Sequence, residues 1–577
     1  MQKNTLSRRI AVAQGQVPAD LVLKNATVVN VFTQELLSAD IAIADGVIAG
    51  LGSYHGLAEV DCTGKTVCPG LIDAHMHMES TMVAPAELAR AIVPTGTTTL
   101  IADPHELVNV CGAEGVRYFL EATEGLPLNV YLMLPSSVPA TAFETNGADF
   151  TAADMAPFLS HPRVLGLGEV MCYPNVLAGD AQILEKLLLF SGAGKCADGH
   201  APGLTGKALQ AYAAAGITTE HECTTFAEAA EKLRAGQAVL VREGSAAHNL
   251  TTLLTGWLAS GLPCERMLMC TDDKHLDDIA RDGHILQNVK LAVELGVPAV
   301  TAICMATWNT ARAYGLRDTG AVAAGYRADL VVLDDLKHCH VLNVYKDGVP
   351  VQEALMRGTN APVPDALLHS MHGAPVTAAQ LALPVGDTAH VIEMIPYQIA
   401  TKHAVERVPQ REGLFVPDSV YTKLCVVERH GKNGNIAVCP LKGYGICGGA
   451  IATSVAHDSH NLIAAGDNDA DLVLAINRCK EIGGGYVLTG GGRVLGELPL
   501  AIGGLMSTQP WQDVQRVTAE MIQRAGGMGI PYYVDPFISL SFLALPVIPE
   551  LRLTDEGLFD VVAFCRVTDE RQGGLKP

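Results

Sequence analysis

Two histidines at the end of an apolar run are the clearest candidates for chemistry in this chain. They are His75 and His77, in the string Pro-Gly-Leu-Ile-Asp-Ala-His-Met-His. Successive side chains of a strand point to opposite faces, so residues two apart share one face. Both imidazoles can then reach one ion, and neutral imidazole binds Zn, Fe and Mn-type cations. The pair alone is a weak signal, because two histidines this close also occur in ordinary cores and surfaces.

Further residues of ligand type end later apolar runs, and together with the histidine pair they form a candidate set. They are Glu169, His200, His221 and Asp272. Four histidines, one bridging carboxylate and one terminal aspartate suit two divalent ions, which make hydroxide available at neutral pH. Asp103 and His105 end another run. They could close a strand, orient the ligands or bind an extra metal.

The elements that must position these residues alternate between strand-like and helical segments. Eight apolar runs are separated by segments able to form helices, which predicts a (β/α)8 barrel of the TIM type. In that fold the active site lies at the carboxyl ends of the strands, where the candidate ligands fall. The runs are Val67–His77, Thr98–His105, Asn129–Ser137, Val164–Val170, Lys195–Ala201, Thr218–Glu222, Gln237–Ser245 and Met267–Lys274.

Two regions of short strands and turn residues flank the barrel, at 20–60 and 320–350. We expect them to form one small β-sandwich domain that the barrel splits. The predicted class is therefore α/β, with the small domain in 1–64 and 319–378 and the barrel in 65–318. A Gly-rich region of mixed helix and strand signals predicts an additional C-terminal α/β domain in 379–577.

Composition narrows the partners and the compartment. The net charge of −21 disfavours nucleic acid and anionic membranes, which need a basic face. No apolar run is long enough to span a bilayer, and no signal peptide is evident. The 15 cysteines are scattered without a Cys-x-x-Cys pair. This pattern favours reduced thiols in a cytoplasmic protein. The negative net charge fits a small neutral or cationic substrate better.

The sequence resembles the amidohydrolase superfamily and, within it, the adenine deaminase family, from about residue 20 onward. Many amidohydrolases carry a carboxylated lysine at the end of the fourth barrel strand. Here Glu169 stands in its place, which is similar to the adenine deaminases. The resemblance rests on the strings at 69–80, 103–106 (Asp-Pro-His-Glu), 199–207, 242–246, 271–275 (Thr-Asp-Asp-Lys-His) and 448–461.

The resemblance implies hydrolysis of adenine to hypoxanthine and ammonia in purine salvage, by metal-activated hydroxide attacking C6. Asp272 would pass the water proton to the leaving amine. A carboxylic acid of raised pKa would protonate N1, with Glu243 as the first candidate and Glu222 as the second. The implied substrate contacts are Arg242, Ser245, Asp273 and His275, and the implied metal ligands are His75, His77, Glu169, His200, His221 and Asp272.

The resemblance also favours a binuclear Mn²⁺ centre, with Fe²⁺ second, and a homodimer. Residue types alone admit Zn²⁺ as well. The alternatives are a hydrolase of cyclic amides, a deaminase of another aminopurine, a phosphosugar deacetylase and a non-catalytic scaffold. The string from His457 to His460 looks like a second metal or catalytic set. We favour a loop that covers the barrel or contacts a neighbouring subunit.

Overall fold

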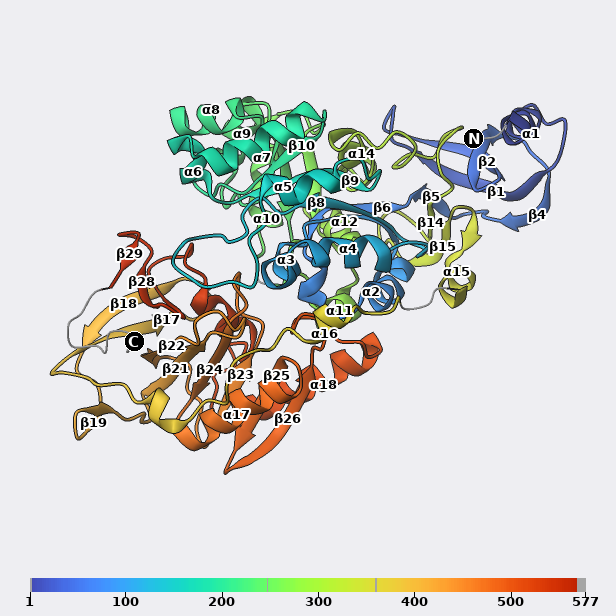
Figure 1. Ribbon diagram of the computed structural model, residues 1–577. Helices are drawn as coiled ribbons and strands as arrows, with labels where there is room; N and C mark the ends of the chain where they lie inside the picture. The colour runs from blue at the N-terminus through green and yellow to red at the C-terminus, as the bar shows by residue number, and fades with distance from the viewer. Residues whose placement is uncertain (1–2, 246, 358–360, 568–577) are drawn as a thin grey trace.

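The computed structural model describes residues 3–245, 247–357 and 361–567. Its chain forms three parts, a small β domain, a barrel and a tail domain that lies below the barrel in Figure 1. In the described residues no helix is both long and apolar enough to cross a membrane.

The small β domain is one eight-stranded sheet built from both sides of the barrel. Its order is β16-β15-β14-β5-β1-β2-β3, and β4 pairs with β1. Strand β14 lies antiparallel to β5, and this pairing joins the part of the small domain that precedes the barrel to the part that follows it. The strands are β1 (Ala19–Asn30), β2 (Glu35–Ala44), β3 (Val47–Gly52), β4 (Gly56–Asp61), β5 (Thr66–Pro69), β14 (Leu330–Leu333), β15 (Val341–Lys346) and β16 (Val349–Pro350), beside the helices α1 (Lys3–Ala13) and α15 (Val351–Arg357).

Eight parallel strands close the barrel. Strands β6 to β10 form one sheet and β11 to β13 another. Two parallel bridges, Ala197 to Ile217 and Met76 to Asp272, join the sheets at both edges. The strands are β6 (Leu71–Met76), β7 (Thr97–Ala102), β8 (Asn129–Leu134), β9 (Val164–Val170), β10 (Cys196–Gly199), β11 (Thr219–Glu220), β12 (Ala238–Arg242) and β13 (Met267–Cys270).

Helices cover the outside of the barrel and follow its strands. They are α2 (Pro85–Ile92), α3 (His105–Cys111), α4 (Ala113–Ala122), α5 (Ala152–Met155), α6 (Tyr173–Ala178), α7 (Ala181–Gly192), α8 (Gly206–Ala214), α9 (Phe226–Arg234), α10 (Leu250–Ser260), α11 (Leu276–Asp282), α12 (Ile285–Glu294), α13 (Ala299–Met305) and α14 (Trp308–Ala313). The alternation of strands and helices confirms the predicted α/β class with a TIM-type barrel.

The first predicted run, Val67–His77, is divided between two sheets. Its first residues form β5 of the small domain, and its last residues form β6 of the barrel. The division falls at Gly70, where an added Cβ would collide with the side chain of Thr98. A residue without a side chain is therefore needed where the chain passes from one sheet to the other.

The tail domain is an eight-stranded mixed sheet of order β18-β17-β22-β21-β24-β23-β25-β26. Helix α17 (Asp469–Glu481) packs on β23, β24 and β25, and α18 (Trp511–Gly527) packs beside β26. The side chain of Asn468 caps α17 by accepting from the N–H of Asp471. The strands are β17 (Ala389–Met394), β18 (Thr401–Glu406), β21 (Tyr421–Val427), β22 (Ile436–Lys442), β23 (Gly449–Thr453), β24 (Leu462–Gly466), β25 (Gly485–Gly490) and β26 (Arg493–Pro499).

Shorter elements complete the tail and its connection to the barrel. They are α16 (Asp365–Leu368), α19 (Ile538–Ser541), the pair β19 (Gln410–Arg411) and β20 (Leu414–Phe415), and the three-stranded sheet of β27 (Leu551–Thr554), β28 (Gly557–Asp560) and β29 (Cys565–Arg566).

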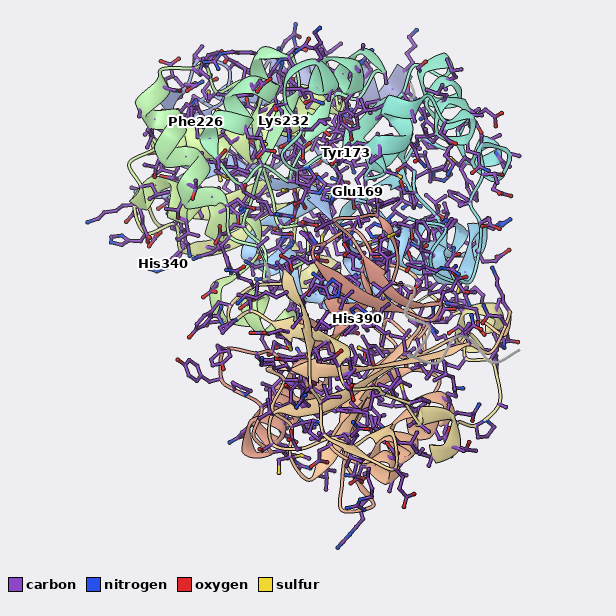
Figure 2. All side chains as sticks on the ribbon, turned by 90° about the vertical axis from the view of Figure 1, so that its left-hand side faces the viewer. Glu169, Tyr173, Phe226, Lys232, His340 and His390 are labelled. Carbon is purple, nitrogen blue, oxygen red and sulfur yellow. The ribbon has the colours of Figure 1, made fainter. Side chains whose placement is uncertain are left out.

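The tail packs against the barrel mouth through a shared apolar core. Met82 and Leu107 of the barrel belong to the same buried cluster as Leu505 and Phe537 of the tail. The backbone N–H of Trp511 also donates to the carboxylate of Glu87 on α2, at 3.2 Å. Figure 2 shows Glu169 in the barrel, with the tail domain below it.

Candidate metal centre

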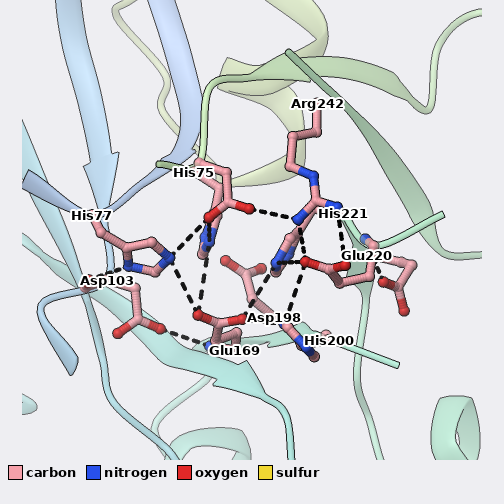
Figure 3. Close-up of polar contacts among 12 residues, drawn as sticks. His75, His77, Asp103, Glu169, Asp198, His200, Glu220, His221 and Arg242 are labelled. Atoms are coloured by element: carbon pink, nitrogen blue, oxygen red, sulfur yellow. Dashed lines mark hydrogen bonds and ion pairs between the residues drawn. The ribbon is translucent and has the colours of Figure 1, made fainter. Parts of the chain in front are cut away.

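The carboxylate of Glu169, at the end of β9, lies at the centre of a cluster of histidines (Figure 3). Its Oε2 lies 2.5 Å from Nδ1 of His200 and 3.3 Å from Nε2 of His221. Its Oε1 lies 3.4 Å from Nε2 of His77 and 3.9 Å from Nε2 of His75. Each of these residues ends a barrel strand or directly follows one. The barrel therefore brings the five residues together at its carboxyl face.

Asp272, two residues after the end of β13, completes the cluster. Its Oδ1 lies 3.0 Å from Nε2 of His77 and 3.7 Å from Nε2 of His75. Its backbone N–H donates to the carbonyl of His75 at 2.9 Å. Its φ is +60°, a left-handed conformation that residues other than Gly seldom adopt. The barrel closure at this bridge holds that conformation, which aims the carboxylate at the histidines.

The donor chemistry of the cluster fits a metal centre. Nδ1 of His77 lies 2.9 Å from the carbonyl of Asp103, so it carries the proton and leaves the lone pair of Nε2 facing the cluster. Nε2 of His75 is buried without a hydrogen-bond partner among the described residues. Two groups of potential ligand atoms share Glu169, one with His75 and His77 and one with His200 and His221. Imidazole and carboxylate are ligands that catalytic divalent ions take.

Asp103 and His105 both lie next to Glu169, and they take different positions. Oδ2 of Asp103 accepts from the backbone N–H of Glu169 at 2.8 Å, which fixes the end of β9. Nδ1 of His105 lies 3.3 Å from Oε1 of Glu169 and has no hydrogen-bond partner among the described residues. Asp103 therefore orients a ligand, whereas His105 stands beside the ligand atoms themselves.

Arg242, at the end of β12, joins two carboxylates in the cluster. Its Nη1 donates to Oδ2 of Asp272 at 2.7 Å, and its Nη2 donates to Oε2 of Glu222 at 3.0 Å. Burial disfavours the ionised form of Asp272, but the hydrogen bond with His77 and the charge of Arg242 outweigh it and hold its pKa well below the ordinary value. Burial also raises the pKa of Glu222, but the charge of Arg242 lowers it, and the pKa of Glu222 lies below its ordinary value.

The charge of the carboxylates also acts on His200. Burial alone would lower its pKa, but the charges of Glu222 and Glu169 raise the pKa of His200 to about 9. In the metal-free cluster this imidazole therefore holds a proton at neutral pH, and an ion that binds there must displace it.

The structure does not bring the predicted residue Glu243 into the cluster. Its Oε1 lies 2.7 Å from Nδ1 of His248, and its Oε2 accepts from the backbone N–H of Leu250 at the start of α10. Glu222, the second candidate for the proton donor to N1, faces Arg242. Strand β11 ends at Glu220, so the alternation of a strand does not govern Glu222.

The remaining predicted substrate contacts lie at the edge of the centre. The side chain of Ser245 hydrogen-bonds Asp278 and accepts from the N–H of His275 at 2.9 Å. Asp273 hydrogen-bonds the hydroxyl of Ser80. Asp273 and His275 line a cavity at the barrel mouth, whereas Ser245 lies beside a second cavity. Ala246, the last residue of one resemblance string, is outside the described residues.

Sequence reasoning did not single out Glu106, which meets the tail domain at the barrel mouth. Its Oε1 lies 2.6 Å from Nδ1 of His457 and 3.4 Å from Nε2 of His105, and its Oε2 is hydrogen-bonded to Nε2 of His460. The string from His457 to His460 therefore reaches the barrel. Nothing but its place in the Asp-Pro-His-Glu string pointed to Glu106.

The side chains of Glu106, His457 and His460 are close enough to hold an ion. Their hydrogen bonds indicate instead that they bind one another. Nδ1 of His460 accepts from the backbone N–H of Ala456 at 3.2 Å, so its proton is on Nε2 and is donated to Glu106. Burial lowers the pKa of His460 to about 4, which keeps it neutral. Burial opposes a charge on His457, but Glu106 raises its pKa to about 9. The group is satisfied as an ion pair between the barrel and the tail.

Comparison with known proteins agrees with this geometry. Residues 66–351 match the amidohydrolase family, and residues 398–565 match the adenine deaminase C-terminal domain. An adenine deaminase of Desulfitobacterium hafniense is 49% identical over 97% of this chain and 98% of that protein. One of Geobacillus kaustophilus is 45% identical over 97% of this chain and 98% of that protein.

A solved structure resembles part of the chain. The crystal structure of a β-aspartyl dipeptidase from Fervidobacterium islandicum AW-1 superposes with a TM-score of 0.44 at 16% identity. It covers 59% of this chain and 99% of that one.

Proposed function

This chain belongs to the adenine deaminase family, and from that premise we infer that the cluster around Glu169 hydrolyses adenine to hypoxanthine and ammonia. The observation that carries the assignment is the completeness of the cluster. Four imidazoles and two carboxylates from five strand ends have ligand atoms within 4 Å of a neighbour, and all but the half-buried His200 are buried. A protein of this family acting only as a scaffold has no need of such a set, because buried charged groups are costly to keep.

The cluster holds a metal cofactor, which the family and the ligand chemistry both support. We propose that two divalent ions would be held here, one by Glu169, His75 and His77 and the other by Glu169, His200 and His221. We favour Mn²⁺, with Fe²⁺ as the second choice. Bound there, the ions supply water that is activated for attack at neutral pH.

Asp272 is the group we assign to proton transfer. Its carboxylate lies beside the ligand atoms and is held ionised, so it can accept the proton of the attacking water. In the reaction a C6–O bond forms and the C6–N bond of adenine breaks. The same carboxyl then delivers the proton to the departing amine, so that ammonia leaves as a neutral molecule.

Glu222 and Arg242 act, in our assignment, as positioning residues for Asp272. Because Arg242 lowers the pKa of Glu222, this carboxyl lacks the raised pKa that a proton donor to N1 needs. One oxygen of the Glu243 carboxylate contacts His248, and the other accepts from the backbone N–H of Leu250 at the start of α10. Both oxygens are therefore engaged outside the cluster. We therefore place neither residue at N1.

The test is ammonia release from adenine by the metal-loaded protein, with adenosine and dihydroorotate as competing substrates and metal content measured in parallel. Asp272→Asn should lower kcat by about 10²–10⁴-fold, the range for loss of a general base. Ammonia from adenine alone supports the proposal. Turnover of dihydroorotate without turnover of adenine would instead assign the site to cyclic amides. Light scattering in the same preparation tests the proposed homodimer.

A further inference from the structure

A cavity lies between the barrel mouth and the tail domain. The barrel contributes Glu79, Ser80 and Asp273, and the tail contributes apolar walls from Leu505, Ile538 and Phe542. An apolar slot with a few polar groups suits a flat aromatic base.

The cavity adjoins the metal cluster. Asp273, one of its walls, follows Asp272 and has a carboxylate oxygen within 4.8 Å of the ligand atoms of Asp272 and His77. Glu106, another wall, lies 3.4 Å from His105, which in turn lies 3.3 Å from Glu169. A molecule in the cavity therefore lies one residue, Asp273, away from Asp272 and His77.

Glu79 gives this cavity a polar group that has no partner. The residue is 4% exposed, and its Oε1 accepts from the backbone N–H of Leu107 at 3.1 Å. Its Oε2 is buried and has no hydrogen-bond partner among the described residues. A buried carboxylate oxygen left unpaired is costly, so this atom is explained best by a donor that a ligand supplies.

We propose that the purine ring of adenine binds in this interdomain cavity, with an N–H of its imidazole half donated to Oε2 of Glu79 and with Phe542 of the tail forming one apolar wall. The inference rests on the proposed function and adds the substrate pocket to it. It also gives the tail domain a role in binding the base. A nucleoside has carbon in place of hydrogen at N9, so the same contact would select the free base.

The experiment compares adenine with 7-methyladenine and 9-methyladenine as competitors in the metal-loaded enzyme. Competition yields an inhibition constant whether or not the competitor is turned over. The wild type should bind at least one methylated base about 100-fold more weakly than adenine, because the contact is lost and Glu79 is left unpaired. In Glu79→Ala this preference should shrink to within a few fold, since the methyl group fills the space that the carboxylate leaves.

Two further variants separate binding from damage to the fold. Phe542→Leu keeps an apolar side chain but removes the ring, and it should raise the KM for adenine about tenfold with metal content unchanged. Glu87→Ala is the matched control, because Glu87 is also a buried glutamate that bonds the tail but does not line the cavity. It should leave the preference for adenine as in the wild type.

The outcomes separate this inference from the proposed function. A wild type that deaminates adenine but binds both methylated bases as tightly as adenine overturns the pocket and leaves the function standing. So does an unchanged preference in Glu79→Ala. A metal-loaded wild type that releases no ammonia from adenine overturns the function and the pocket together.

Discussion

Arg242 and Asp272 are joined by a hydrogen bond of 2.7 Å from Nη1 to Oδ2, while the other oxygen of Asp272 lies 3.0 Å from His77. Each oxygen of this carboxylate therefore has its own neighbour. The arginine holds one oxygen in place and leaves the second to face the histidines. The planar fork of Arg242 also reaches Glu222, so a single cation orients both carboxylates.

Replacing this arginine should change the pH dependence of the reaction. Arg242→Lys keeps the charge but cannot reach both carboxylates, so we expect kcat/KM to fall about 100-fold. Without the full contact the pKa of Asp272 rises, so the acid limb of the profile of kcat/KM should move to higher pH. Arg117→Lys, at an exposed pair with Glu114, is the control. An unmoved acid limb would separate Arg242 from the titration of Asp272.

Glu222 and Glu243 should differ sharply when each is changed to glutamine. Glu222→Gln weakens the hold on Arg242 and should lower kcat/KM about tenfold, with little change in KM. Glu243→Gln alters a contact with the exposed His248 and should keep nearly full activity. Steady-state kinetics with adenine give the comparison. If Glu243→Gln loses activity and Glu222→Gln does not, Glu243 would again be the first candidate for the proton donor to N1.

Glu169 should control metal content. Glu169→Gln removes the negative charge that four histidines face, and we expect metal affinity to fall at least about 10–100-fold. Added Mn²⁺ should then raise the melting temperature of the variant less than that of the wild type. Elemental analysis after dialysis measures the effect directly, and Glu114→Gln on the surface serves as the control. Full metal content in Glu169→Gln would contradict the shared ligand.

His284 should make the fold sensitive to acid. Burial, aided by the charge of Lys274, lowers its pKa to about 3, against about 6.5 in an unfolded chain. As the pH falls below 6.5, the unfolded state takes up a proton that the folded state refuses. Stability is therefore lost by about 1.4 kcal/mol per pH unit down to pH 3.

The variant His284→Asn isolates this effect. At pH 7.5 it should melt below the wild type, because it weakens a hydrogen bond of 3.0 Å to Thr97. Between pH 6.5 and 5 the gap in melting temperature should narrow, since the variant lacks the protonation penalty. Calorimetry of both proteins at pH 6.5 and pH 5 shows whether the gap in melting temperature narrows. A gap that widens on acidification would mean that His284 is protonated in the folded protein.

The sequence by itself determined the barrel and the order of its ligands. Parallel strands in such a barrel end at one face, so polar residues at the ends of apolar runs must meet there. This argument sufficed to place His75, His77, Glu169, His221 and Asp272 in one cluster, because each one follows or ends a strand.

Only the tertiary structure decided where residues beyond the strand ends point. Glu222 and Glu243 both lie past their strands, where alternation no longer holds, and the structure places Glu222 against Arg242 and Glu243 against His248. The contact of Glu106 with His457 joins residues 351 positions apart, and no local pattern encodes a contact at that distance. Side-chain direction in irregular segments and the docking of one domain on another are settled by packing, which acts between parts that the sequence keeps apart.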